Sequence, residues 1–365
     1  MAHRNRESRA TQLTGIAPTS HGGCLVHSHA FAPGLGPSAT TRVLEFAHNT
    51  WRTRGDVPDV AHTMVCLPDL RRTPLVVTRG GVRALDGGAD VGPESGSTAS
   101  GFLTDLRNIG GRYYCCGIGG CVQVRTAGSW EPVGALSSHP ASEYGLVLLN
   151  AVAGLSSSNL VVVGTHGLIF HWNGSRWAEL ESPTHGALHG VLAIDEQRLF
   201  VCGEDGALYL GRTHGWRRLS PARPGVTYRD LAYCGGQLYI LSNEPKLYTL
   251  NSLGRLEDVA DQVPALRTVA AISASANTLW AVSGHCVLRF EAGVWAEVIC
   301  PPDLLPQTSA SHESTVDASV QTIRDRDATV VPLLHAPRRT PRNGAKRPTH
   351  GGVIVPFAPR SNRAG

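Results

Sequence analysis

Lysine is almost absent from this chain, in which only Lys246 and Lys346 accompany the arginines among 33 basic residues. Charged residues make up only 17% of the 365 residues, and aromatic residues only 6%. No apolar run approaches the roughly 18 residues that a membrane-spanning helix needs, so we expect no membrane span. The first residues also lack the apolar segment of a secretory signal, which favours a cytoplasmic location.

A cysteine framework is missing as well. The nine cysteines are an odd number without regular spacing, and several lie within apolar runs, where a thiol behaves as a small hydrophobic group. Cys115 and Cys116 are adjacent, so on a strand they point to opposite faces and predict packing rather than a zinc site. His27 and His29 share one strand face but have no third ligand nearby. We therefore expect reduced thiols, no metal and no cofactor.

Catalytic motifs are also absent. The chain has no G-x-S-x-G elbow, no H-E-x-x-H pair and no calcium-binding loop. The glycines at 117–120 precede a strand pattern, whereas a dinucleotide-binding loop must open a helix. An enzyme whose catalytic residues converge from separate repeats stays open as an alternative.

Glycine and short apolar runs are abundant instead, with 41 glycines and 42% hydrophobic residues. Between Leu160 and Leu219 one pattern occurs twice. An apolar run ends at Gly164 or Gly203, a second glycine follows three residues later, and Trp177 or Trp216 opens a last short run. Units of short strands and tight turns with a period near 40 residues are typical of propeller blades.

The tryptophan spacing gives the number of copies. The gaps between Trp51, Trp130, Trp177, Trp216 and Trp295 are 79, 47, 39 and 79 residues. Each gap of 79 holds two units, and copies without tryptophan occur near residues 62–86 and 228–256. The gap of 47 holds one unit and a longer connection at 135–146. The total is seven copies.

We therefore predict an all-β, seven-bladed β-propeller of four-stranded antiparallel blades, in which the tryptophans cover the seams between blades. The expected organisation is a flexible N-terminus (1–11), the propeller (12–302) and a disordered basic tail rich in Ser, Pro and Arg (303–365). Either residues 12–17 or a strand near 328–334 could close the ring, and the sequence does not choose between them.

The segments Val163-Gly164…Gly167…Asn173-Gly174…Trp177 and Cys202-Gly203…Gly206…Gly215-Trp216 resemble the WD40/YVTN/BNR-like propeller superfamily, in particular the bacterial photosystem-assembly-factor-like repeats. The resemblance covers about residues 12–302. It implies the fold but no single function, because propellers host many unrelated roles. The Trp-Asp ending of true WD40 blades and the Ser-x-Asp-x-Gly-x-Thr-Trp box of sialidase-type blades are missing.

One face of the predicted ring carries two sets of loops, namely the turns between the second and third strands and the connections between blades. Loops on a rigid scaffold often bind partners. The predicted partner-binding residues on these loops are His139, Glu143, Tyr144, His166, Glu204, Asp205, Glu244, Lys246 and His285.

These observations favour a non-enzymatic protein-binding scaffold, such as a bacterial immunity or accessory protein that binds a toxin or effector. The alternative is a propeller enzyme acting on carbohydrate, a lyase or hydrolase, which predicts clustered carboxylates in the central funnel. The tail from Arg338 to Arg363 carries seven basic residues and could make weak, nonspecific contacts with nucleic acid or an anionic surface.

Overall fold

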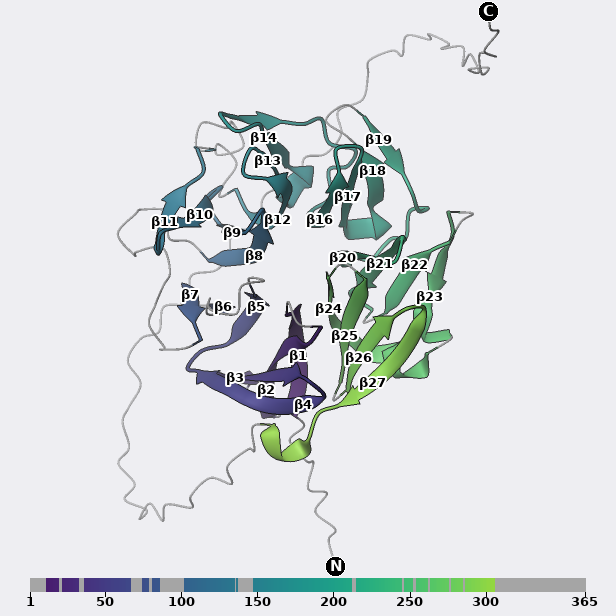
Figure 1. Cartoon of the computed structure of the whole chain (residues 1–365). Coiled ribbons are helices and arrows are strands. Elements are labelled where there is room, and N and C mark those ends of the chain that lie inside the picture. Colours follow the sequence, from purple (N-terminus) through teal and green to yellow (C-terminus); the bar gives the residue numbers. More distant parts are fainter. Residues whose placement is uncertain are drawn as a thin grey trace, which may run out of the picture. The chain divides into compact units, whose positions relative to one another are not determined.

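The computed structural model describes residues 11–305 apart from 20–21, 33–35, 67–73, 79–80, 86–101, 135, 137–146, 212–214, 245, 252–253, 262, 276 and 285. Within these residues the chain forms seven antiparallel sheets arranged around a central axis (Figure 1). Each sheet is one blade, and its strands follow one another in the sequence from the axis outward. This confirms the predicted seven-bladed propeller.

The first four blades lie in chain order. Blade 1 consists of β1 (Thr11–Pro18), β2 (Cys24–Ala32), β3 (Gly36–Ala47) and β4 (Thr50–Val57). Blade 2 consists of β5 (Ala61–Val65), β6 (Leu75–Thr78) and β7 (Gly81–Ala84). Blade 3 consists of β8 (Leu103–Ile109), β9 (Arg112–Gly117), β10 (Val122–Thr126) and β11 (Ser129–Pro132). Blade 4 consists of β12 (Leu149–Ser156), β13 (Asn159–Gly164), β14 (Ile169–Trp172) and β15 (Trp177–Glu179).

The last three blades repeat the pattern. Blade 5 consists of β16 (Leu188–Asp195), β17 (Arg198–Gly203), β18 (Leu208–Gly211) and β19 (Trp216–Arg218). Blade 6 consists of β20 (Tyr228–Cys234), β21 (Gln237–Ser242), β22 (Leu247–Leu250) and β23 (Leu256–Asp258). Blade 7 consists of β24 (Val269–Ser275), β25 (Thr278–Ser283), β26 (Cys286–Glu291) and β27 (Val294–Ile299). Six blades thus have the four strands expected, whereas the described residues of blade 2 give three.

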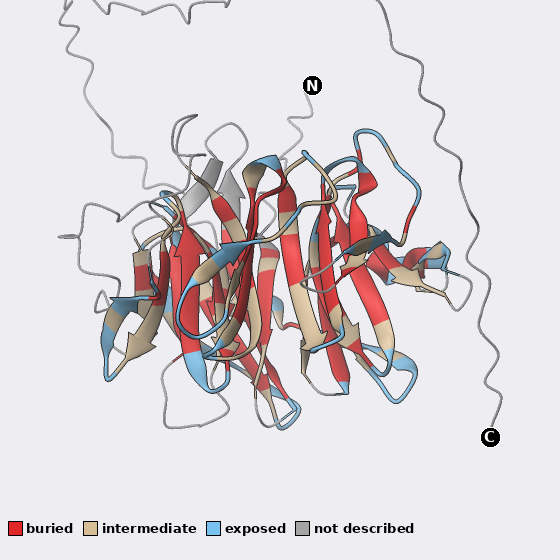
Figure 2. Cartoon of the chain, turned by 90° about the horizontal axis from the view of Figure 1, so that it is seen from above, coloured by how far each residue is buried: buried red, intermediate tan, exposed pale blue. Residues whose placement is uncertain are grey.

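Short 3-10 turns supplement the strands. They are η2 (Thr165–Gly167), η3 (Glu204–Gly206), η4 (Val259–Asp261), η5 (Pro264–Thr268) and η6 (Pro302–Leu304). Buried residues run through the strands, while exposed residues gather at the turns at both ends (Figure 2).

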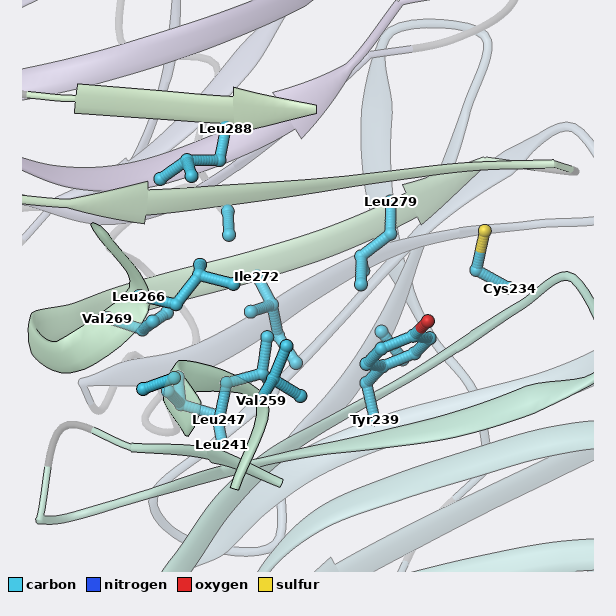
Figure 3. Close-up of a cluster of buried hydrophobic side chains, with 13 residues drawn as sticks. Cys234, Tyr239, Leu241, Leu247, Val259, Leu266, Val269, Ile272, Leu279 and Leu288 are labelled. Carbon is cyan, nitrogen blue, oxygen red and sulfur yellow. The ribbon is translucent and has the colours of Figure 1, made fainter. Parts of the chain in front are cut away.

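The core consists of apolar clusters at the seams between neighbouring blades. The cluster in Figure 3 joins blades 6 and 7 through residues such as Tyr239, Leu241, Ile272 and Leu279. The outer-strand tryptophans pack at such seams: for example, Trp216 lies against the cluster of blades 4 and 5, and its indole N–H donates to the carbonyl of Glu181 at 2.8 Å. The predicted seam position of the tryptophans is therefore confirmed.

The ring closes by packing between the first and last blades. Residues 12–17 lie within β1, which pairs with β2 inside blade 1, so this segment is not a strand of blade 7. Instead, Leu13 donates a backbone hydrogen bond to the carbonyl of Gly284 at 3.1 Å, and Leu44 shares a buried cluster with Trp280. The alternative segment near 328–334 lies outside the described residues.

The first glycine of the repeated pattern is required by a close approach between chain segments. Gly203 has extended backbone angles, and a Cβ there would overlap the carbonyl oxygen of Ala187, in the connection between blades 4 and 5. At Gly164 the overlap would be with the equivalent carbonyl of Leu148. The glycine thus allows the second strand to end directly against the next connection.

We expect Gly203→Ala to lower the free energy of unfolding by about 1–3 kcal/mol, since backbone must move to make room. Urea unfolding measures this change. Gly186→Ala is the control, because a Cβ there would lie 3.4 Å from its nearest neighbours and needs little adjustment. Equal effects of the two substitutions would contradict this explanation.

Candidate functional site

Five of the nine predicted face residues fall within the described residues. They lie on the turns between the second and third strands of three consecutive blades: His166 in η2, Glu204 and Asp205 in η3, and Glu244 and Lys246 between β21 and β22. The inter-blade connections meet these turns on the same face, as shown by the backbone hydrogen bond from Glu204 to Ala187 at 3.0 Å. His139, Glu143, Tyr144 and His285 lie outside the described residues.

The two carboxylates of η3 hold the neighbouring connections in place. Glu204 Oε2 accepts a hydrogen bond from the backbone N–H of Ala187 at 2.9 Å, and Asp205 Oδ1 accepts one from Gly225 at 3.1 Å. Both side chains are exposed. Their part in the structure is to fasten the loop sets to each other, which keeps the face rigid.

The charges of the next turn are paired. Glu244 Oε2 accepts a hydrogen bond from the Tyr248 hydroxyl at 3.2 Å and lies 3.7 Å from the guanidinium of Arg223. Arg223 also lies over the Tyr248 ring, 5.1 Å from its centroid. Lys246 Nζ is 3.3 Å from Asp258 Oδ2, and this carboxylate raises the pKa of the lysine. These contacts fix the side chains of the sixth blade.

Every innermost strand has a β-bulge near its start, at the second residue in blades 2 to 7 and at the fourth residue, Thr14, in blade 1. The register shifts between Leu188 and Gly190 in blade 5 and between Tyr228 and Asp230 in blade 6, and the other five blades have the same shift. A bulge leaves one residue unpaired and re-aims its side chain. The bulged residues are Thr14, His62, Thr104, Asn150, His189, Arg229 and Ala270, and all seven line a central cavity of about 650 Å3.

Some bulged residues tie neighbouring blades together. Thr104 Oγ1 donates to the carbonyl of Leu149 at 2.5 Å, and Asn150 Nδ2 donates to the carbonyl of Leu188 at 2.8 Å. Each acceptor is the residue that precedes the bulge in the following blade. This ring of bulged residues, which we call the rim, therefore also supports the closed shape of the ring.

His189 and Arg229 form the part of the rim between blades 5 and 6. Gly190, which has no side chain, brings the backbone of Arg229 and Asp230 close to blade 5. Burial lowers the pKa of His189, Glu204 opposes this shift, and Arg229 adds to it. The imidazole is therefore neutral near pH 7 and presents one N–H donor beside an exposed guanidinium.

A partly buried ion network crosses the cavity next to the rim. Arg107 of β8 is 3.0 Å from Asp105 Oδ1 and reaches Asp230 Oδ1 of β20 at 3.3 Å, although blades 3 and 6 are three places apart in the ring. Asp105 also accepts backbone N–H bonds from Leu106 at 2.9 Å and Val152 at 3.0 Å. Burial raises the pKa of Asp230, and Arg107 opposes that shift. We call this network the cross-brace.

The cross-brace bears on the carbohydrate-enzyme alternative, which predicts clustered carboxylates in the funnel. Asp105 and Asp230 do meet there, but both bind the guanidinium of Arg107. Asp105 also accepts hydrogen bonds from backbone amides, including that of Val152. A general acid or nucleophile needs a carboxylate that faces the substrate. This geometry fits a structural role.

Comparisons with known proteins agree with this architecture. No protein family model matches the chain. The WD40 β-propeller domain of Doa1 superposes with a TM-score of 0.59 at 12% identity, covering 82% of this chain and 97% of that one. YCF48 from Cyanidioschyzon merolae superposes with a TM-score of 0.54 at 12% identity, covering 78% and 95%. The chain therefore shares the β-propeller fold of these two proteins.

A curated protein also resembles this propeller in sequence. The immune protein Tsi7 of Pseudomonas aeruginosa is 26% identical over 275 residues, which are 71% of this chain and 88% of that protein. The likeness therefore extends over most of both chains, whereas the structural neighbours at 12% identity show the fold alone.

The suspected metal ligands of the propeller have structural roles. Cys115 packs in the seam of blades 2 and 3 and Cys116 in that of blades 3 and 4, which confirms that they point to opposite faces of β9. His27 and His29 bond to Thr14 at 3.0 Å and Thr41 at 3.1 Å. Among the residues that the structure describes, no cluster of three or more His, Cys, Asp or Glu could hold a metal ion, and no helix could cross a membrane.

Neither the rim nor the cross-brace was predicted from the sequence. The sequence does, however, contain a pattern that marks the rim residues. The innermost strands begin with apolar residues three positions apart, for example Leu188 and Val191 or Tyr228 and Leu231, and these residues are buried. Strict alternation would place them two apart. The break in alternation marks the bulge, and the residue after the first apolar one is the rim residue.

Proposed function

We propose that the protein is a non-enzymatic scaffold in the cytoplasm that acts as an immunity protein, binding a protein toxin through the face that carries the rim. The observation that carries this proposal is the similarity to the immune protein Tsi7 over most of both chains. The structure supports it with a face whose loops are fastened by hydrogen bonds and ion pairs. Such preorganisation reduces the entropy lost on binding.

A direct test expresses the products of the genes that flank this one, each with and without the protein, and records cell survival. The proposal expects one product to be toxic alone and tolerated with the protein, and to form a stoichiometric complex with it near physiological salt. If no flanking product is both toxic and neutralised, the immunity role is wrong.

The same complex can be measured with a chain truncated after residue 303. We expect the truncated chain to bind as the full chain does, because the proposed contact lies on the propeller. The basic segment from Arg338 to Arg363 would then serve only weak, salt-dependent contacts with anionic polymers. Loss of binding on truncation would instead place the contact in the tail.

A further inference from the structure

Arg229 is a rim residue whose guanidinium is available to bind a partner's carboxylate. Its side chain is exposed and lines the cavity, and no ion pair joins it to a carboxylate in the part of the chain that the structure describes. Three acidic residues of blades 5 and 6 on this face already have partners. Glu204 is held by a backbone amide, Glu244 by Arg223, and Asp230 by the cross-brace. An incoming carboxylate would therefore meet an uncompensated guanidinium.

Phe102 supplies an apolar side chain next to the rim, where it contacts the rim residue His62. It immediately precedes β8 and is 41% exposed, and only two other large hydrophobic side chains of the described residues, Val294 and Ile299, are exposed. Its ring lies 5.0 Å from the ring of the rim residue His62. Exposed aromatic and arginine side chains are the types that most often dominate the binding energy of protein interfaces.

The two features lie on different sides of one opening. Phe102 and His62 belong to the junction of blades 2 and 3, and His189 and Arg229 to that of blades 5 and 6. The cavity that His62, His189 and Arg229 line, about 650 Å3, has the size of pockets that hold one small ligand. A cavity of this volume can take the side chains at the tip of a partner's loop.

We propose that the rim is the contact site for the protein partner: a loop of the partner inserts an aspartate or glutamate whose carboxylate binds Arg229 and His189, while an apolar side chain packs on Phe102. This inference rests on the proposed immunity function and adds which chemical groups of the toxin would bind the rim. A guanidinium pairs with a carboxylate through two parallel N–H donors, and the His189 N–H can supply a third.

The experiment measures the dissociation constant of the complex with the neutralised toxin for the wild type and four variants. Arg229→Glu is expected to weaken binding at least about 100-fold, and Phe102→Ala about 10-fold or more. Arg229→Lys keeps the charge but loses the bidentate geometry, so its effect should be smaller than that of Arg229→Glu. Arg176→Glu is the control, because Arg176 is exposed on the turn between β14 and β15 at the opposite end of the blades.

A charge swap then identifies the partner's carboxylate. Acidic residues of the toxin are changed one at a time to lysine, and one of these changes should restore binding to Arg229→Glu by at least about 10-fold. Wild-type binding by Arg229→Glu, or an equal loss in Arg176→Glu, would overturn the rim contact while leaving the immunity function intact. A wild-type protein that binds no flanking product would remove both.

Discussion

Replacing Arg107 by methionine is expected to lower the free energy of unfolding by about 2–3 kcal/mol at pH 7. Methionine keeps much of the aliphatic volume but leaves Asp105 and Asp230 without their shared cation. Removing one partner of a buried ion pair costs more than the pair contributes, because an uncompensated charge stays behind. We set the value below that of a fully buried pair because the Arg107 side chain is 38% exposed to the cavity.

The pH dependence separates lost charge from lost packing. Burial raises the pKa of Asp230 and Arg107 opposes that shift, so without the guanidinium the folded chain protonates Asp230 at a higher pH than the unfolded chain does. The loss in stability should therefore be smaller near pH 4 than at pH 7. Adding Asp230→Asn to Arg107→Met should recover part of the loss at pH 7. Arg217→Met, on the exposed strand β19, is the control and should change little.

A loss that is equal at pH 4 and pH 7 and is not reduced by Asp230→Asn would indicate a packing defect. The cross-brace would then be an incidental contact. The outcome matters for the fold, because this network joins blades that share no seam. In a ring held mainly by contacts between neighbours, one such contact couples residues 123 positions apart in the chain.

The repeat was visible in the sequence because each copy carries the same local requirements. Trp177 and Trp216 open the outer strands and pack at seams, so their spacing counts blades directly. Gly167 and Gly206 have positive φ, at 72° and 66°, as tight turns between strands require. These features depend on residues close in sequence, which is why a single chain is enough to read them.

The cross-brace and the ring closure could not be read in the same way. The partner of Arg107 lies two full repeats beyond the next blade, and nothing local in the β8 sequence specifies it. The closure depends on Leu13, Leu44 and Trp280, which are apolar residues like those of any other seam. The rim could be predicted in part. Its bulges have a local sequence signal, but the sequence does not show that the Arg229 guanidinium lacks an ion pair, because that depends on which partners the surrounding acidic residues have.

The second large effect concerns His27, which lies 1% exposed on β2 at the inner part of blade 1. Its Nδ1 bonds to Thr14 Oγ1 at 3.0 Å, while its Nε2 is buried without a partner among the described residues. A Cβ at Gly15 would overlap the imidazole, so the missing side chain of Gly15 makes room for the ring. Burial, with smaller contributions from the nearby His29 and His62, lowers the pKa of His27 from 6.5 to about 3.

This shift makes the propeller sensitive to acid. The unfolded chain takes up a proton at His27 below pH 6.5, whereas the folded chain does so only near pH 3. Stability is therefore complete above pH 6.5 and falls by about 1.4 kcal/mol per pH unit as the pH drops toward 3, or about 2–3 kcal/mol by pH 4.5. Burial also lowers the pKa of His29, which adds a loss of the same sign.

His27→Asn removes this titration and should flatten the dependence of unfolding free energy on pH between 6.5 and 4.5, even if the variant is less stable at pH 7. His166→Asn is the matched control, because His166 is exposed and its positive φ of 57° suits asparagine. Its slope should equal that of the wild type. If the unfolding free energy of His27→Asn depends on pH as steeply as that of the wild type, other groups cause the acid sensitivity. The contact between Gly15 and His27 would then matter only for packing.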